Sequence, residues 1–324
     1  MKAIPEASLA TIREVVSHFI SEVTNSYKID EKALRSTPID KLRPAVVADL
    51  KQSSLKGHLE YLDSKNQLTM ACHVAADFTL SHPLEYQIIV AQLTIFFFHA
   101  EDILEEKPEV LRQLQRNVAT GQPCGDPVLD WYARELTPRL WNHFDPLVAN
   151  MITIACYDFI NRIGIESLTK DVNIQPQAVA FPDWLRFKTG LSPMYALLAL
   201  ARPSDRGLPT GGLDKYIQVM PDVIIFTNIV NDVISFYKEL LAGEKGNYID
   251  MRAQREGITV LEALNTLAKE GIQVHKRVLA ALEDEPEYRA NFNTYAKGSA
   301  HFHTSSPRYR IRELFSAKEK NKLM

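Results

Sequence analysis

Residues 231–239, NDVISFYKE, place three oxygen-bearing side chains at intervals of four residues. The segment continues the apolar run 223–230, so the pattern predicts that it lies inside a helix. In a helix, Asn231, Ser235 and Glu239 stand at about 0°, 40° and 80° around the axis and form one stripe, here called the NSE stripe. An amide oxygen, a hydroxyl and a carboxylate suit a hard divalent cation such as Mg²⁺. A solvated helix face with incidental polar residues is the alternative.

A second group of candidate metal ligands, here called the acidic cluster, consists of Glu101, Asp102 and Glu105. Residues three or four apart share a helix face, so these carboxylates can converge. Between residues 101 and 109 there are five acids and one base. Carboxylates this crowded repel one another unless a cation or solvent relieves them. The ordinary acidic end of a helix is the alternative to a metal site.

Several donor side chains could bind the oxygens of a phosphate. Lys238 borders the NSE stripe at about −20° around the helix. Arg308 and Tyr309 begin a tail that carries six bases and two acids as far as the last residue. Arginine offers a fork of donors that matches phosphate oxygens, and tyrosine adds a hydroxyl. Arg186 and Lys188 are further candidates, and surface bases in a solvated helix or tail are the alternative.

Aromatic residues occur near both sets of candidate ligands. They could line an apolar pocket and stabilise a carbocation through their π faces, although plain core packing explains them equally well. The chain contains no HExxH and no GxSxG motif, so hydrolase chemistry gains no support. The aromatic candidates are Phe96, Phe97, Phe98, Tyr157, Phe159 and Phe226.

Composition excludes several other function classes. The chain has 324 residues, 46% hydrophobic and 24% charged, as in ordinary globular proteins. Its 13 glycines fall below the usual share of roughly 7%. Neither GxGxxG nor GxxxxGK(S/T) occurs, so a bound phosphate must be held without a glycine loop. A net charge of −3 gives no general electrostatic case for a nucleic-acid partner.

Cysteine usage and hydropathy bear on the compartment. The three cysteines lie far apart and none is part of a CxxC, which argues against a disulfide framework or structural zinc and fits a reducing compartment. The start shows no apolar signal core. The longest apolar stretches, 88–100 and 194–201, fall short of the roughly 20 residues that span a bilayer. We therefore expect a soluble cytoplasmic protein with no membrane span.

The elements that position these residues are expected to be helices. Helical periodicity covers almost the whole chain, beginning with Ile12, Val15, Val16 and Phe19, whereas strand-like alternation is nearly absent. The breaks are short and none looks like a flexible interdomain linker, so we predict one all-α domain over 1–324, although length alone favours two. Further helices are expected at 42–62, 84–105, 127–136, 146–164, 183–201, 213–241, 257–282 and 288–303, with a glycine break at Gly190.

At these residues the chain resembles the class I terpene synthases, and within them the trichodiene synthase-like sesquiterpene cyclases of fungi. Residues 231–239 match the family's second metal motif, (N/D)Dxx(S/T)xxxE, with the family's KE ending. Arg308 and Tyr309 match the C-terminal RY pair that binds diphosphate. Arg186 precedes Asn231 by 45 residues, close to the usual place of the pyrophosphate-sensing arginine. The resemblance covers most of the chain in order and spacing.

The resemblance implies a single-domain helical bundle around an apolar active-site cavity, with three Mg²⁺ ions bridging the protein and the diphosphate of an isoprenoid substrate. The NSE stripe would chelate one ion and the acidic cluster the other two. Arg186, Lys238, Arg308 and Tyr309 would stabilise the leaving diphosphate. Ionisation of farnesyl diphosphate would give a carbocation that cyclises in a pocket lined by aromatic residues. Relatives of this type often pair as dimers, so the resemblance makes a homodimer one of the alternatives and leaves the oligomeric state open.

The acidic cluster departs from the family's DDxx(D/E) pattern, because Glu101 stands where the first aspartate belongs. A frame that starts at Asp102 and ends at Glu106 loses the adjacent acidic pair. Either the site tolerates the longer side chain, or Asp102 alone chelates, or ionisation is weakened.

Three functions follow from these residues. The first is a sesquiterpene cyclase. The second is a terpenyl or prenyl transferase whose cation is captured by a non-water nucleophile such as an amine. The third is a non-catalytic relative that binds diphosphate or a partner. A chain-elongating prenyl synthase would need a second aspartate-rich motif where residues 231–239 stand.

Overall fold

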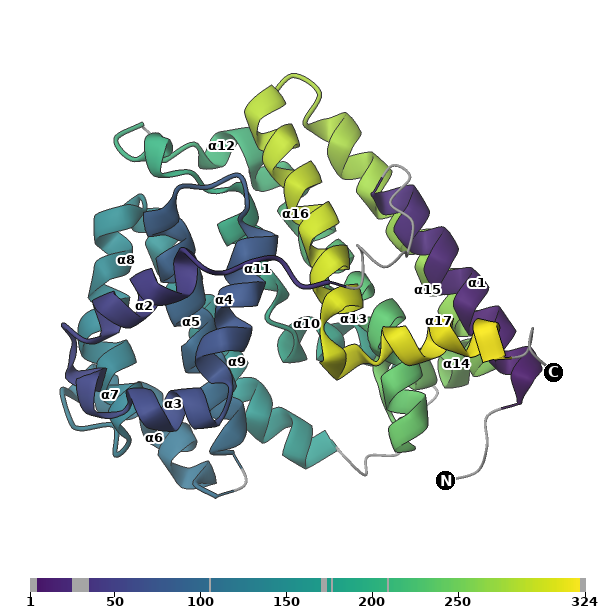
Figure 1. Ribbon diagram of the computed structural model, residues 1–324, viewed down its shortest axis with the longest axis horizontal. Coiled ribbons are helices and arrows are strands. Elements are labelled where there is room, and N and C mark those ends of the chain that lie inside the picture. Colours follow the sequence, from purple (N-terminus) through teal and green to yellow (C-terminus); the bar gives the residue numbers. More distant parts are fainter. Residues whose placement is uncertain are drawn as a thin grey trace. The chain divides into compact units, whose positions relative to one another are not determined.

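Helices form every regular element in the described part of this computed structural model (Figure 1), which comprises residues 5–24, 35–104, 106–169, 174–175, 177–208 and 210–320. The predicted all-α fold is confirmed. The helices gather into two compact units, one made of Met1–Ser36, Lys170–Ser192 and Val219–Met324, the other of Thr37–Thr169 and Pro193–Gln218. The expectation of a single domain over 1–324 stays a prediction.

The first unit holds the NSE stripe and the C-terminal RY pair. Its helices are α1 (Glu6–Val23), α10 (Phe181–Thr189), α13 (Met220–Ala242), α14 (Tyr248–Glu256), α15 (Val260–Ala281), α16 (Pro286–Ser305), the 3₁₀ turn η5 (Pro307–Tyr309) and α17 (Ile311–Lys320).

The second unit holds the acidic cluster. Its helices are α2 (Leu42–Leu50), η1 (Ser54–Gly57), α3 (Leu59–Ser64), α4 (Gln67–Phe78), α5 (Leu84–Asp102), α6 (Pro108–Thr120), α7 (Pro127–Trp131), the π-helical turn η2 (Tyr132–Leu136), α8 (Thr137–His143), α9 (Pro146–Thr169), α11 (Ser192–Leu200), η3 (Pro203–Asp205) and α12 (Leu213–Tyr216). The short turn η4 (Ile217–Val219) follows α12 in the chain and precedes α13.

In the first unit, α13 packs against α15, and α1 lies along α15 on another side (Figure 1). The apolar face predicted for α1 is confirmed, because Ile12, Val16 and Phe19 are completely buried. Gly271 allows the close approach of three helices. A Cβ atom there would lie 2.6 Å from Cγ2 of Ile229 and 2.8 Å from Cε2 of Phe19.

In the second unit, α5 is apolar around nearly its whole circumference and packs against α4 and α2. Phe96 of α5 stacks on Tyr132 of η2, with ring centroids 3.8 Å apart. The Tyr86 hydroxyl donates to the carbonyl oxygen of Leu198 at 2.8 Å and so ties α5 to α11. A helix that is buried on all sides in this way holds its C-terminal end, and with it the acidic cluster, in a fixed place.

Several helix boundaries differ from those expected, and proline or glycine explains most of them. The stretch 183–201 is two helices, because Gly190 is extended (φ −94°, ψ 149°) between α10 and α11, as the predicted glycine break requires. Pro108 begins α6, and Pro221 lies in the first turn of α13, where a proline has no hydrogen bond to lose. Helices α4, α6, α8, α14 and α17 lie outside the expected ranges. Among them, α14 begins at Tyr248. Its cap is Asn247, whose side chain accepts from the backbone N–H of Asp250.

Among the described residues, one stretch, Leu213–Ala242, is long and apolar enough to cross a membrane, and its most apolar 18-residue window has a mean hydropathy of 1.4. Of its most apolar window, 61% is buried within the structure. Core helices of soluble proteins have these same properties, and α13 makes up most of the stretch, so we assign no membrane span.

Candidate functional site

The NSE stripe lies on α13, as the spacing predicted. The side chain of Ser235 is only 2% exposed, whereas Asn231 and Glu239 are half-buried. Glu239 accepts a hydrogen bond at Oε2 from Nδ2 of Asn247, at 3.0 Å. Lys238 Nζ lies 3.8 Å from Oε1 of Glu239. The three candidate ligands therefore follow one helix face, with a lysine at its border.

Burial disfavours the charged forms of two carboxylates at the stripe, those of Glu239 and Asp232. It raises the pKa of Glu239, although the Ser235 hydroxyl and the Lys238 ammonium oppose the rise. It also raises the pKa of Asp232, against the opposing effect of the Arg186 guanidinium. A carboxylate that is partly desolvated and incompletely neutralised gains from a bound cation.

The Ser235 hydroxyl lies close enough to Glu239 to lower its pKa, yet its oxygen makes no hydrogen bond of ordinary geometry among the described residues. An unsatisfied buried oxygen beside a carboxylate and an amide is a donor set that fits Mg²⁺. No group of three or more His, Cys, Asp and Glu side chains in the described residues could hold a metal ion. The NSE stripe is of another kind, because only one of its three ligands is a carboxylate.

Arg186 of α10 joins this face of α13. Its Nε lies 2.9 Å from Oδ2 of Asp232. Its Nη2 lies 3.4 Å from Oδ1 of Asn231 and 3.4 Å from the backbone oxygen of Asn228. The predicted phosphate-binding arginine and the first residue of the NSE stripe are thus direct neighbours.

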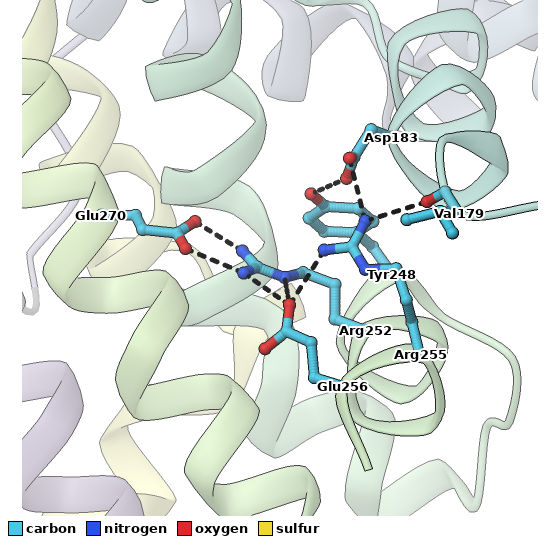
Figure 2. A network of polar contacts seen from close by, with 7 residues as sticks. All are labelled: Val179, Asp183, Tyr248, Arg252, Arg255, Glu256 and Glu270. Atoms are coloured by element: carbon cyan, nitrogen blue, oxygen red, sulfur yellow. Dashed lines mark hydrogen bonds and ion pairs between the residues drawn. The ribbon is translucent and has the colours of Figure 1, made fainter. Parts of the chain in front are cut away.

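A network of polar contacts fixes the helix that carries Arg186 (Figure 2). Asp183 lies one turn before Arg186 on α10 and accepts from the Tyr248 hydroxyl at 2.6 Å. Arg255 Nη1 lies 2.9 Å from the other oxygen of Asp183. Both partners belong to α14, so α14 anchors α10.

The same network fastens α14 to α15. Arg252 points away from Asp183 toward Glu270, as Figure 2 shows, and its Nη2 donates to Oε1 of Glu270 at 2.8 Å. Glu256 accepts from both Arg252 and Arg255. The core helix α15 therefore holds α14 in place, and α14 in turn holds α10, which carries Arg186.

The C-terminal RY pair belongs to the same unit as the stripe. Tyr309 is buried in η5, and its ring centroid lies 4.6 Å from that of His303 on α16. Arg308 is exposed. His303 Nε2 lies 3.2 Å from Nδ2 of Asn231, so one buried imidazole contacts both the RY pair and the NSE stripe. Burial lowers the pKa of His303 to about 4.

The acidic cluster ends α5 in the second unit. Glu101 accepts from Nη2 of Arg162 at 3.2 Å, and Asp102 accepts from Nε2 of Gln67 at 2.7 Å. Glu105 lies outside the described residues. Each of the two described carboxylates therefore has one donor that holds it, and Asp102 remains exposed.

A buried histidine–aspartate pair supports the same end of α5. His99 Nε2 lies 2.8 Å from Oδ1 of Asp126, and both side chains are 3% exposed. Asp126 also caps α7 by accepting from the backbone N–H of Val128 at 2.9 Å. Burial alone would raise the pKa of Asp126, but hydrogen bonds from His99, Val128 and Lys107 outweigh it and lower the pKa to about 2.

The aromatic candidates occupy different surroundings. Phe97 is buried edge-to-face against Phe159, with ring centroids 4.7 Å apart, whereas Phe98 and Tyr157 are half-buried. Phe226 packs against both His275 and Phe292 in the core of the first unit. By helix geometry Phe226 lies about 140° around α13 from Asn231. A pocket-lining role for the four predicted residues, Phe97, Phe98, Tyr157 and Phe226, stays a prediction.

The family model for trichodiene synthase (TRI5) matches residues 83–323. The chain belongs to the trichodiene synthase family. It is 33% identical over 276 residues to alpha-cuprenene synthase COP6 of Coprinopsis cinerea, across 83% of this chain and 82% of that protein. It is 28% identical over 232 residues to Monoterpene synthase 25 of Postia placenta, across 71% of this chain and 68% of that protein.

The fold of this trichodiene synthase family member is shared by enzymes of low sequence identity. The crystal structure of the linalool/nerolidol synthase from Streptomyces clavuligerus matches it with a TM-score of 0.62 at 13% identity, over 83% of this chain and 96% of that one. The family match spans both the acidic cluster and the NSE stripe.

Sequence reasoning missed the side chains that contact the candidate metal ligands of this family member. Arg162 and Gln67 lie 61 and 35 residues from the carboxylates that they contact, so no local spacing could reveal them. His303 is 72 residues from Asn231. The residues around it in the chain, 299–306, are mostly polar, so no sequence signal distinguishes His303.

Proposed function

We propose that this chain is a class I terpene synthase that ionises farnesyl diphosphate and releases diphosphate from it, a carbon–oxygen lyase reaction. The observation that carries the proposal is the NSE stripe itself, with a buried unsatisfied Ser235 oxygen and the Arg186 guanidinium beside Asn231. Membership of the trichodiene synthase family supports it.

The metal ions are assigned from the oxygen sets of the two units. We place one Mg²⁺ on the NSE stripe and two on the acidic cluster, three in all, as the resemblance implies. When bound, Mg²⁺ supplies positive charge that stabilises the diphosphate as it leaves. The carboxylates of Glu101 and Asp102 are acceptors only, and each side chain of the NSE stripe has an oxygen that can act as an acceptor. All of these oxygens are therefore suited to bind Mg²⁺.

Four side chains bind the diphosphate oxygens in this proposal: Arg186, Lys238, Arg308 and Tyr309. The fork of Arg186 can exchange the Asp232 carboxylate for a phosphate oxygen without changing its charge. Lys238 Nζ lies 3.8 Å from both Glu239 and Glu244, so neither carboxylate holds it tightly. These donors stabilise the leaving group as negative charge develops on it.

The reaction breaks the bond between the allylic carbon and the diphosphate oxygen, and both electrons leave with the diphosphate. The allylic cation that remains is attacked by another double bond of the same isoprenoid molecule, which closes a ring. Loss of a proton from carbon then gives a neutral hydrocarbon. Aromatic faces stabilise the cation without supplying a nucleophile.

One incubation tests the proposed function. Purified protein and Mg²⁺ are incubated separately with geranyl, farnesyl and geranylgeranyl diphosphate, because one relative is named for monoterpenes. Hydrocarbons are extracted, and released diphosphate is measured in the same samples. A cyclic hydrocarbon from farnesyl diphosphate at the highest rate supports the proposal. Diphosphate release only after an amine is added would indicate a transferase, and no turnover with any of the three would exclude both enzymes.

A further inference from the structure

His303 has a hydrogen-bonding state that its neighbours define. Its Nδ1 lies 2.6 Å from the backbone carbonyl oxygen of Ser299. A carbonyl oxygen can only accept, so Nδ1 carries the hydrogen. When Nδ1 carries the hydrogen of a neutral imidazole, the other ring nitrogen, Nε2, is the hydrogen-bond acceptor.

This acceptor faces the amide of Asn231. Nε2 of His303 lies 3.2 Å from Nδ2 of Asn231, so the amide N–H donates to the ring. On the other side of the amide, Nη2 of Arg186 lies 3.4 Å from Oδ1 of Asn231. A guanidinium can only donate, so it requires an oxygen at that place. The guanidinium on α10 thus defines the orientation of the amide, and in that orientation the amide N–H points to the ring nitrogen on α16.

We propose that His303 is a positioning residue that fixes the amide of Asn231 with its oxygen available to a metal ion. This inference rests on the proposed function, in which Asn231 is a Mg²⁺ ligand. The nitrogen and oxygen of an amide have nearly the same shape, so packing alone cannot distinguish its two orientations. Only the oxygen can bind a cation, because the NH₂ group has no free lone pair to offer.

The surroundings of His303 hold the ring itself in place. Its Nδ1–H donates to the backbone carbonyl oxygen of Ser299, one turn earlier on α16, and its ring centroid lies 4.6 Å from that of Tyr309. When a residue hydrogen-bonds a metal ligand without touching the metal, its removal changes the metal affinity by roughly 10–100-fold. The role of His303 is therefore measurable apart from turnover.

The test compares His303→Phe and His303→Gln in two backgrounds, unchanged and Asn231→Asp. Phenylalanine keeps the ring and removes the acceptor, whereas the carbonyl oxygen of glutamine restores an acceptor. Asn231→Asp presents oxygen in both orientations and so makes orientation irrelevant. Isothermal calorimetry measures the dissociation constant of inorganic diphosphate at fixed Mg²⁺, and thermal unfolding checks that each variant is folded.

We expect His303→Phe to weaken diphosphate binding about tenfold with Asn231 present. We expect His303→Gln to remain within about threefold of the unchanged protein, and His303→Phe to cost less than about threefold in the Asn231→Asp background. An equal loss in both backgrounds would indicate a structural role only and overturn the proposal, as would tight binding by His303→Phe with Asn231 present. Unchanged Mg²⁺-dependent binding by Asn231→Ala would instead overturn the metal assignment on which the proposal rests.

Discussion

Arg186 and Asp232 form an ion pair in which the guanidinium Nε lies 2.9 Å from the carboxylate Oδ2. Asp232 directly follows Asn231, so the arginine expected to bind diphosphate is held against the helix that carries the NSE stripe. Burial raises the pKa of Asp232, and the guanidinium opposes this rise. Each charge is therefore stabilised by the other until a phosphate oxygen replaces the carboxylate.

Both the positive charge of Arg186 and the forked geometry of its N–H donors are expected to be necessary for diphosphate release. Arg186→Lys keeps the charge but cannot contact Asp232 and Asn231 together, so we expect diphosphate release to slow at least about tenfold. The matched control is Arg277→Lys, which alters an exposed pair with Asp222 at 2.7 Å. Steady-state assays check both variants, and an Arg186→Lys rate within twofold of the unchanged enzyme would count against the assignment.

Gly190 is expected to permit the approach of α10 to α13. A Cβ atom at this position would overlap Oδ1 of Asn228 and lie 3.2 Å from Nη1 of Arg186. We expect Gly190→Ala to lower the free energy of unfolding by about 1–3 kcal/mol and to slow turnover. Gly164→Ala is the control, because a Cβ there meets nothing within 4 Å and should stabilise α9 by about 0.5–1 kcal/mol. Urea unfolding measures both, and equal effects would contradict the steric explanation.

Glu101 is expected to be a metal ligand despite its extra methylene group. Glu101→Gln removes its charge, so the Mg²⁺ concentration for half-maximal activity should rise severalfold. Glu106→Gln, which changes an exposed acid nearby, should leave that concentration unchanged. Titration of activity against Mg²⁺ distinguishes the two. If Glu106→Gln has the larger effect, the frame that starts at Asp102 is the correct one.

Asp126 is expected to stabilise the fold in a pH-dependent way. Its pKa is lowered to about 2 in the folded state, so the stabilisation is fully present above about pH 4 and is lost as the pH falls toward 2. Asp126→Asn should therefore lower the free energy of unfolding by about 2 kcal/mol at pH 7. The difference from the unchanged protein should shrink below about pH 4. Glu109→Gln, at an exposed side chain, is the control for urea unfolding across pH.

The parts of the site that follow local spacing could be predicted from the sequence. The NSE stripe is one example, because helix geometry alone places residues four apart on one face. The apolar face of α1 and the break at Gly190 are others. Expected helices at 257–282 and 288–303 correspond to α15 and α16 within a few residues.

Contacts that depend on tertiary packing could not be predicted in this way. Asp232 reads as part of a metal motif, yet its partner Arg186 lies 46 residues away, and only the folded chain brings them together. Arg162 reads as an ordinary helix base until α9 places it beside Glu101. Pro108 reads as a break although it begins α6, because a proline is compatible with either a loop or a first helical turn.

Glu239 and Glu244 offer the most direct test of the central claim, that the NSE stripe is the metal-binding part of a diphosphate-ionising site. Both carboxylates lie 3.8 Å from Lys238 Nζ, but only Glu239 belongs to the stripe. The decisive measurement is Mg²⁺-dependent release of diphosphate from farnesyl diphosphate by Glu239→Gln and Glu244→Gln. We predict that Glu239→Gln loses at least about 100-fold in rate, as expected when a metal ligand is removed, and that Glu244→Gln stays within about twofold. Unchanged turnover by Glu239→Gln would contradict the claim.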